Sequence, residues 1–119
     1  MKTESPKTVL IVDDMEIIAE MVGEYLQRKG YLVHIFDDPE KALRHLSIHG
    51  TTVIVSDFQM GAMNGVQFLA QAYTILPEIR AVLMTSEPGK LTSFDIPWPV
   101  VEKCGNFCEQ IVAVIECWE

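Results

Sequence analysis

The chain has 119 residues, of which 49% are hydrophobic, and this size and composition predict one domain with its own core. The chain contains nine Lys and Arg residues and 17 Asp and Glu residues. The resulting net charge of −8 argues against direct binding of nucleic acid by this domain. The apolar runs are too short to span a membrane and the polar start lacks the apolar core of a signal peptide, so we expect a cytoplasmic protein without membrane contact.

From residue 8 onward, short apolar runs alternate with amphipathic stretches, whereas residues 1–7 are polar and are expected to form a flexible tail. The apolar runs have the length and composition of buried strands, and the amphipathic stretches repeat apolar residues at helical spacing. The predicted strands cover residues 8–12, 31–36, 52–56, 79–84 and 99–102. The predicted helices cover residues 16–29, 39 to about 50, and 66–73, and a last helix follows residue 106. We expect Asp37 and Asp38 to cap the second helix and Asn106 to cap the last one.

The segment that starts at Ser86 interrupts this alternation. Its sequence, SEPGKLTSFDIPWP, contains three prolines and a glycine, which oppose a helix interior, so we expect at most a short, irregular fourth helix there. The alternation of strands and helices elsewhere predicts an α/β fold in which helices cover both faces of a parallel sheet.

Polar residues stand at the ends of the predicted strands. Asp13 and Asp14 follow the first strand and Asp57 follows the third, whereas Thr85 and Lys103 follow the fourth and fifth. Because the carboxyl ends of parallel strands share one edge of the sheet, we expect the three acids to lie in one crevice. Neighbouring carboxylates repel one another unless a cation lies among them, and Mg²⁺ fits because it takes oxygen ligands and leaves room for a phosphoryl oxygen. The pattern therefore predicts a phosphoryl-transfer site.

These positions, in this order, resemble the receiver domain of two-component response regulators. The segment Asp57-Phe58-Gln59-Met60, followed by Met63-Asn64-Gly65, is similar to the family's motif around its central acid. The resemblance implies a single receiver domain over residues 8–119. It also implies a flavodoxin-like (βα)5 sandwich in which the five parallel strands lie in the order 2-1-3-4-5.

The resemblance implies a role for each acid. Asp57 would accept a phosphoryl group from a sensor histidine kinase or a histidine phosphotransfer protein, forming an aspartyl phosphate. Asp57 would also bind Mg²⁺, together with Asp14 directly, Asp13 largely through water, and Gln59 through its backbone carbonyl.

The resemblance also implies roles for the other polar residues of the site. Thr85 would donate its hydroxyl to the phosphoryl oxygens, and Lys103 would act as a point-charge partner. Gln59 and Glu87 occupy the two positions whose side chains influence how fast the phosphoryl group hydrolyses in this family. Both are polar, so we expect water to have access to the group.

The chain departs from the family pattern near Lys103. In the family, proline usually follows this lysine through a cis peptide bond, whereas Cys104 follows Lys103 here. A cis bond before a non-proline residue costs about 3 kcal/mol, so we expect the bond between Lys103 and Cys104 to be trans or strained. Val100 replaces the Tyr or Phe that moves inward on activation in the family. The span from Thr85 to Lys103 is also shorter than is usual in the family by about four residues, roughly one helical turn. We expect coupling through the aromatic position to be absent or reduced, and the loop after Thr85 to carry the response.

The resulting hypothesis is a signalling module that catalyses only its own phosphorylation and dephosphorylation and changes its contacts with an output domain or a downstream protein. Two alternatives stay open. A pseudo-receiver would bind partners without phosphorylation; Cys104 and the short fourth element favour it, whereas the intact set of acids opposes it. A phosphatase-like enzyme with an aspartyl nucleophile would usually carry a second acid two residues after the nucleophile, where this chain has Gln59.

The histidines and cysteines are expected to have structural roles. His45 and His49 lie four residues apart on the second predicted helix and could bind a metal ion, but no acid or cysteine is close to them, so we expect a solvated face. The cysteines are odd in number and form no CxxC pair, so we expect reduced thiols that are buried as small apolar residues. They are Cys104, Cys108 and Cys117.

Overall fold

The computed structural model describes residues 7–51, 53–61 and 63–118. The expectations for residues 1–6, for Thr52 as the start of the third strand and for the end of the domain at Glu119 lie outside these residues. The five strands are β1 (Thr8–Val12), β2 (Leu32–Phe36), β3 (Val53–Asp57), β4 (Arg80–Thr85) and β5 (Val100–Glu102). Apart from the start of β3, which cannot be compared, each strand begins and ends within one residue of its predicted range.

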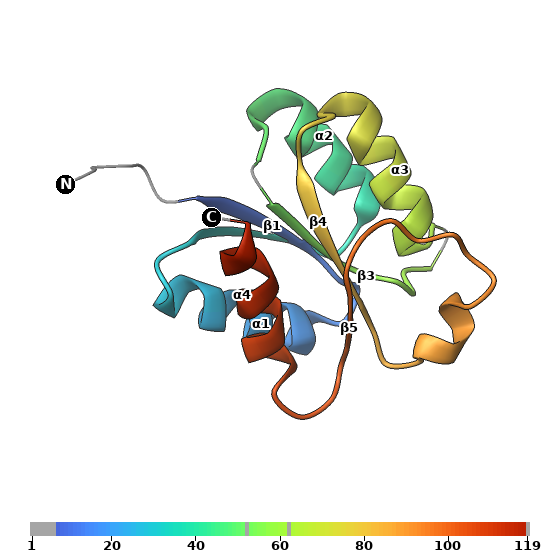
Figure 1. Ribbon diagram of the computed structural model, residues 1–119. Helices are drawn as coiled ribbons and strands as arrows, with labels where there is room; N and C mark the ends of the chain where they lie inside the picture. The colour runs from blue at the N-terminus through green and yellow to red at the C-terminus, as the bar shows by residue number, and fades with distance from the viewer. Residues whose placement is uncertain (1–6, 52, 62, 119) are drawn as a thin grey trace.

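The strands form one parallel sheet in the order β2-β1-β3-β4-β5, which confirms the predicted flavodoxin-like topology. The helices are α1 (Glu16–Arg28), α2 (Pro39–His49), α3 (Gly65–Ile75) and α4 (Phe107–Cys117). α1 and α4 cover one face of the sheet, whereas α2 and α3 cover the other (Figure 1). No described helix is long and apolar enough to cross a membrane.

The two central strands are apolar along their length because both of their faces are covered. Every residue of β3 is buried, and residues 9–12 of β1 have no exposed surface. Alternate residues contribute to two separate cores: Val9 and Ile11 pack with α1 and α4, whereas Leu10 and Ile54 pack with α2 and α3. This arrangement explains the continuous apolar runs in the sequence.

Part of the apolar pattern of α1 does not belong to the core. Ile17 is 74% exposed and Met21 is 46% exposed, although both follow helical spacing. The buried face of the helix consists instead of Ala19, Val22, Gly23 and Leu26. The four-residue step from Ile17 to Met21 puts both side chains on one outward face, so α1 carries an exposed apolar stripe beside its buried one.

Of the helix caps predicted at Asp38 and Asn106, the first forms and the second does not. The Asp38 carboxylate accepts a hydrogen bond from the backbone N–H of Glu40 at the start of α2, as predicted. The expected cap at Asn106 is wrong, because its side chain bonds to two side chains of α4, Glu109 and Gln110, instead of to the backbone. At α3, Asn64 and Gln67 form a reciprocal capping box, which fixes the end of the loop that follows β3.

The segment between β4 and β5 contains only a short 3-10 helix, Pro88–Leu91, in agreement with the predicted irregular element. Aromatic contacts attach the rest of the segment to the domain. Phe94 meets the ring of Phe58 edge-on with 5.3 Å between centroids, and Trp98 stacks on Tyr73 of α3 at 5.8 Å. These two ring contacts hold the irregular segment against the rest of the domain.

The prediction that the cysteines are buried is wrong for at least two of them. All three are free, as expected, but Cys104 and Cys117 are exposed and Cys108 is only partly buried. Burial raises the pKa of the Cys108 thiol. Burial was expected only from the general preference of this residue type, and that preference does not hold here.

Candidate functional site

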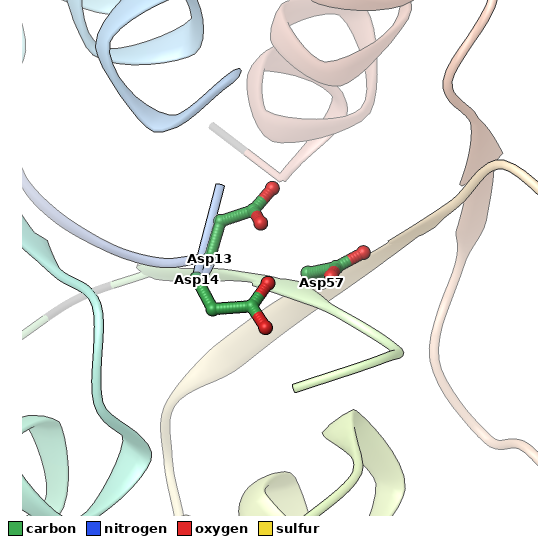
Figure 2. Close-up of side chains that lie close together, drawn as sticks. All are labelled: Asp13, Asp14 and Asp57. Carbon is green, nitrogen blue, oxygen red and sulfur yellow. The ribbon is translucent and has the colours of Figure 1, made fainter. Parts of the chain in front are cut away.

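Three acids meet at the carboxyl ends of β1 and β3, as predicted. One carboxylate oxygen from each of Asp13, Asp14 and Asp57 lies within 4.8 Å of the others, close enough to share a metal ion. Figure 2 shows the side chains of Asp13 and Asp14 next to each other, with the side chain of Asp57 beside them. Asp13 is completely buried and Asp57 is 5% exposed, whereas Asp14 faces solvent. One acid is therefore accessible and two are held within the protein.

The register of the sheet brings these acids together. Val12 of β1 lies opposite Ser56 of β3, so the residues that follow them, Asp13 and Asp57, come side by side. A further bond fixes Asp13, whose backbone N–H donates to the carbonyl of Phe36 at 3.1 Å. The site is thus attached to three neighbouring strands, with β1 at its centre.

Gly65 allows the chain to pass close behind Asp57. A Cβ atom at this position would collide with the Asp57 backbone oxygen and lie 2.7 Å from Leu83 Cδ1. Its backbone N–H also donates to the Phe58 carbonyl at 2.7 Å. The sequence motif contained this glycine, but only the coordinates reveal that a side chain here would displace the backbone of Asp57.

Lys103 joins the two buried acids. Its Nζ lies 2.9 Å from Asp13 Oδ2 and 2.8 Å from Asp57 Oδ1, and its side chain is 8% exposed. Its backbone N–H donates to the Thr85 carbonyl at 2.8 Å, which brings these two predicted residues together. The described residues contain no cis peptide bond, so the bond to Cys104 is trans and the lysine reaches the acids without the family's cis proline.

Burial and the contacts between Lys103 and the acids act in opposite directions on the pKa values of Asp57 and Lys103. Burial raises the pKa of Asp57, the Lys103 ammonium opposes this effect, and the charges of Asp13 and Asp14 add to it. For Lys103, burial lowers the pKa, but the hydrogen bonds to Asp57 and Asp13 together with the negative charges of these two acids raise the pKa overall. Three ionised carboxylates and one ammonium leave two uncompensated negative charges, which one divalent cation would neutralise.

Thr85 ends β4 and is 1% exposed. Its hydroxyl oxygen accepts a hydrogen bond from the Glu87 backbone N–H at 3.0 Å, and this bond does not use the hydroxyl hydrogen. The Glu87 side chain instead pairs with Lys90 at the surface, at 3.0 Å. Thr85 is therefore held in one orientation with a proton still available for donation.

The other two predicted positions face solvent. The side chain of Gln59 is exposed, and no described contact tests the metal-binding role of its carbonyl. Val100 is 40% exposed on β5, where it lies opposite Leu83 of β4. The expectation that coupling through this position is absent or reduced stays a prediction.

Two cavities border the acids on the side of β2 and α2. One, of about 440 Å³, is lined by Asp14, Asp37, Met60 and Met63 among other residues. The second, of about 520 Å³, extends from Asp13 and Asp14 towards Phe36 and the start of α1. The site is therefore open to small molecules beside Asp14, the exposed acid.

Comparison with known proteins identifies the family. A model of the response regulator receiver domain matches residues 9–93. ARR21 of Arabidopsis thaliana, named as a two-component response regulator, is 32% identical over 84 residues, which make up 69% of this chain and 14% of that protein. Transcriptional regulatory protein YvrH of Bacillus subtilis is 30% identical over 93 residues, 75% of this chain and 39% of that protein. The chain thus spans well under half the length of these relatives.

Solved structures resemble the whole domain, beyond the segment that the family model matches. The signal receiver domain of an HD domain-containing protein from Pseudomonas fluorescens Pf-5 superposes with a TM-score of 0.85 at 22% identity, covering 98% of this chain and 89% of that one. Response regulator TrrA of Thermotoga maritima, in complex with Mg²⁺-BeF, superposes with a TM-score of 0.78 at 25% identity, covering 92% and 97% of the two chains. Fold, arrangement of acids and sequence agree, and the chain belongs to the response regulator receiver domain family.

Proposed function

We propose that the chain accepts a phosphoryl group on Asp57 in a Mg²⁺-dependent reaction and passes the signal on by changing its partner contacts. The observation that carries this proposal is the cluster of Asp13, Asp14 and Asp57 with Lys103 bound between the two buried acids. Membership of the receiver family supports it, as does the Mg²⁺-BeF complex of TrrA. A cytoplasmic location is part of the proposal.

In this reaction an Asp57 carboxylate oxygen attacks the phosphorus atom of the donor. The new oxygen–phosphorus bond forms as the bond to the donor breaks, and the donor leaves with the electron pair. Mg²⁺ bound by the three acids, with the Gln59 carbonyl, would neutralise charge on the phosphoryl oxygens. Thr85 donates its hydroxyl hydrogen to one of these oxygens, and Lys103 pairs with another.

The aspartyl phosphate is then hydrolysed by water that reaches it past Gln59 and Glu87. Both side chains are exposed, and Glu87 is held away from the acids by its ion pair with Lys90. Neither residue forms an apolar cover over the site. In this proposal the protein is a signalling module that catalyses only its own phosphorylation and dephosphorylation.

The phosphodonor in this proposal is a sensor histidine kinase or a histidine phosphotransfer protein. One relative, LuxN of Vibrio campbellii, is itself named a sensor kinase/phosphatase, and it is 30% identical over 90 residues. Exposed apolar side chains on and just before α1, Met15, Ile17 and Met21, directly follow the acid pair in sequence and offer a contact surface for the donor. An output domain or a downstream protein would receive the signal.

The loop between β4 and β5 carries the response in this proposal. Phe58 directly follows Asp57 and its backbone N–H donates to Met84, so a change at Asp57 acts on the Phe58 ring. That ring contacts Phe94 in the loop, whereas Val100 is exposed and has no aromatic ring to move. Phe58 and Phe94 therefore offer a route from the site to the surface.

We expect incubation with acetyl phosphate to add one phosphoryl group to the intact protein only when Mg²⁺ is present. Asp57→Asn should abolish the gain because it removes the nucleophile, whereas Asp38→Asn, which changes an acid of the α2 cap, should leave it intact. Intact-protein mass spectrometry measures the gain. No gain in the folded wild-type protein would contradict direct phosphorylation by a small donor; if a panel of histidine kinases also failed to label Asp57, a pseudo-receiver would be favoured.

Lys103→Met should lower the free energy of unfolding by about 3–5 kcal/mol in the absence of Mg²⁺, because it leaves two buried carboxylates without a counter-charge. Mg²⁺ should restore more stability to this variant than to wild type. Urea unfolding with and without Mg²⁺ measures both effects. Lys90→Met, which removes an exposed ion pair, is the matched control and should change stability little. Equal losses in the two variants would contradict the proposed role of Lys103.

Phosphorylation should change amide hydrogen exchange in residues 86–99 more than in β5. We expect this because Phe94, within this segment, contacts Phe58, the residue after Asp57, whereas Val100 of β5 is exposed and has no aromatic ring to move. Exchange is measured by mass spectrometry with and without acetyl phosphate, and Asp57→Asn treated in the same way provides the control. A change confined to β5, with residues 86–99 unaffected, would overturn the proposed route.

A further inference from the structure

His45 contacts two other histidine rings where α2 packs on β2. Its ring lies 4.8 Å from that of His34 on β2 and 4.7 Å from that of His49 one turn further along α2. His45 also contacts the ring of Phe36, at 5.1 Å between centroids. The expectation that His45 and His49 form a solvated face is therefore correct for His49, which is exposed, and wrong for His45, which is half-buried.

The Nε2 atom of His45 makes this contact sensitive to protonation. This nitrogen is buried and forms no hydrogen bond with any described residue. In a neutral imidazole one nitrogen carries no proton, so the buried Nε2 can be a lone pair, whereas an imidazolium carries a proton on both nitrogens. A charged N–H group that is buried without an acceptor costs far more free energy than a neutral buried atom without a partner. The packing therefore favours the neutral ring.

The elements packed against α2 provide no counter-charge for a protonated His45. α2 packs on β1, β2 and α3, and these three elements contain no Asp or Glu. The titratable and charged side chains of the four elements are His34 on β2, Tyr73 on α3, and Glu40, Lys41, Arg44 and His49 on α2 itself. The charges that act on the His45 ring are those of His34 and His49, and both are positive when they are present.

The acids near the start of α2 have other positions. Glu40 lies five residues before His45, which puts it on a different side of the helix. The Asp38 carboxylate caps the helix by accepting the Glu40 backbone N–H, and Asp37 lines the cavity beside Asp14. A proton on His45 thus adds positive charge beside two other imidazoles without an acid to pair with it.

These effects couple folding to pH. Burial lowers the pKa of His45, and positive charge on His34 and His49 lowers it further. In the unfolded chain the ring is solvated and has the ordinary histidine pKa of about 6.5. The unfolded state therefore takes up the proton more readily. The stability that the neutral ring contributes is fully present above this value and is lost as the pH falls below it.

α2 has the smallest buried face of the four helices. Its buried residues are Pro39, Ala42 and Leu46, of which only Leu46 is a large apolar side chain. α1, α3 and α4 each bury four residues. His34 belongs to β2, which lies at the edge of the sheet. Elements with few buried apolar contacts open at the lowest free energy, so a loss of stability at His45 acts first on α2.

We propose that protonation of His45 weakens the contact of α2 with β2, so that α2 opens at mildly acidic pH while the central strands stay folded. The start of α2 lines the cavity beside Asp14, so this opening changes the surroundings of the acids. The device does not depend on phosphorylation of Asp57.

Amide hydrogen exchange of the full chain tests this proposal. Protection factors, corrected for the intrinsic effect of pH on exchange, are compared at about pH 7.5 and about pH 5.5, on either side of the ordinary histidine pKa. We expect the protection of residues 39–49 to fall severalfold at the lower pH, and that of β3 to change much less. His45→Phe should abolish the fall, because a phenyl ring preserves the ring contacts and has no nitrogen to protonate. An equal fall in His45→Phe, or none in wild type, would overturn the proposal.

Titration of the histidine rings by NMR provides a test that does not need His45→Phe to fold. We expect His45 to titrate below the ordinary value of about 6.5 and the amide signals of α2 to change with the same midpoint. His49→Gln, at an exposed position, should raise this midpoint because it removes a neighbouring charge, whereas Ser47→Ala, also exposed on α2, should not. A midpoint at or above the ordinary value, or one that both variants alter alike, would overturn the proposal.

Discussion

The contact of Lys103 with Asp13 and Asp57 is the interaction on which the site depends. The fold brings two buried carboxylates together at the ends of β1 and β3, and the lysine at the end of β5 is the positive charge that binds both. β5 has only three residues, and Lys103 fixes its end through the backbone of Thr85 as well as through the acids. One side chain thus balances charge at the centre of the site and anchors an edge strand.

The same contact limits how the domain can switch. A divalent cation and a phosphoryl group would compete for the charges that Lys103 now holds, so activation must redistribute its contacts. At β5, the residue in the position of the family's aromatic side chain is Val100, which is exposed and has no ring that could respond to a changed contact of Lys103. The aromatic pair of Phe58 and Phe94 provides another connection, from the residue after Asp57 to the irregular segment between β4 and β5. In the proposed function, the shortened fourth element would leave the chemistry of the acids intact and would move the response to the segment between β4 and β5.

The sequence was sufficient to predict the strands and the meeting of the acids, because buried parallel strands have continuous apolar runs and their polar ends share one edge. The order of the strands was predicted from the resemblance to the receiver family. It was not sufficient where the outcome depends on contacts between distant elements. Helical spacing identified Ile17 and Met21 as apolar but could not distinguish an exposed stripe from the buried one. His45 is half-buried against the ring of His34 on β2, so the expected solvated face is wrong for His45, and spacing along α2 could not reveal this contact. The trans bond after Lys103 likewise required coordinates.

A crystal structure of the full chain with Mg²⁺ and beryllofluoride, a mimic of the phosphoryl group, tests the central claim most directly. We expect an adduct on Asp57 and an ion held by Asp13, Asp14 and Asp57. We also expect Lys103 Nζ to have moved from Asp13 to a fluoride of the mimic. An ion bound away from these acids, or a lysine that still bridges Asp13 and Asp57 and leaves the mimic uncontacted, would contradict it.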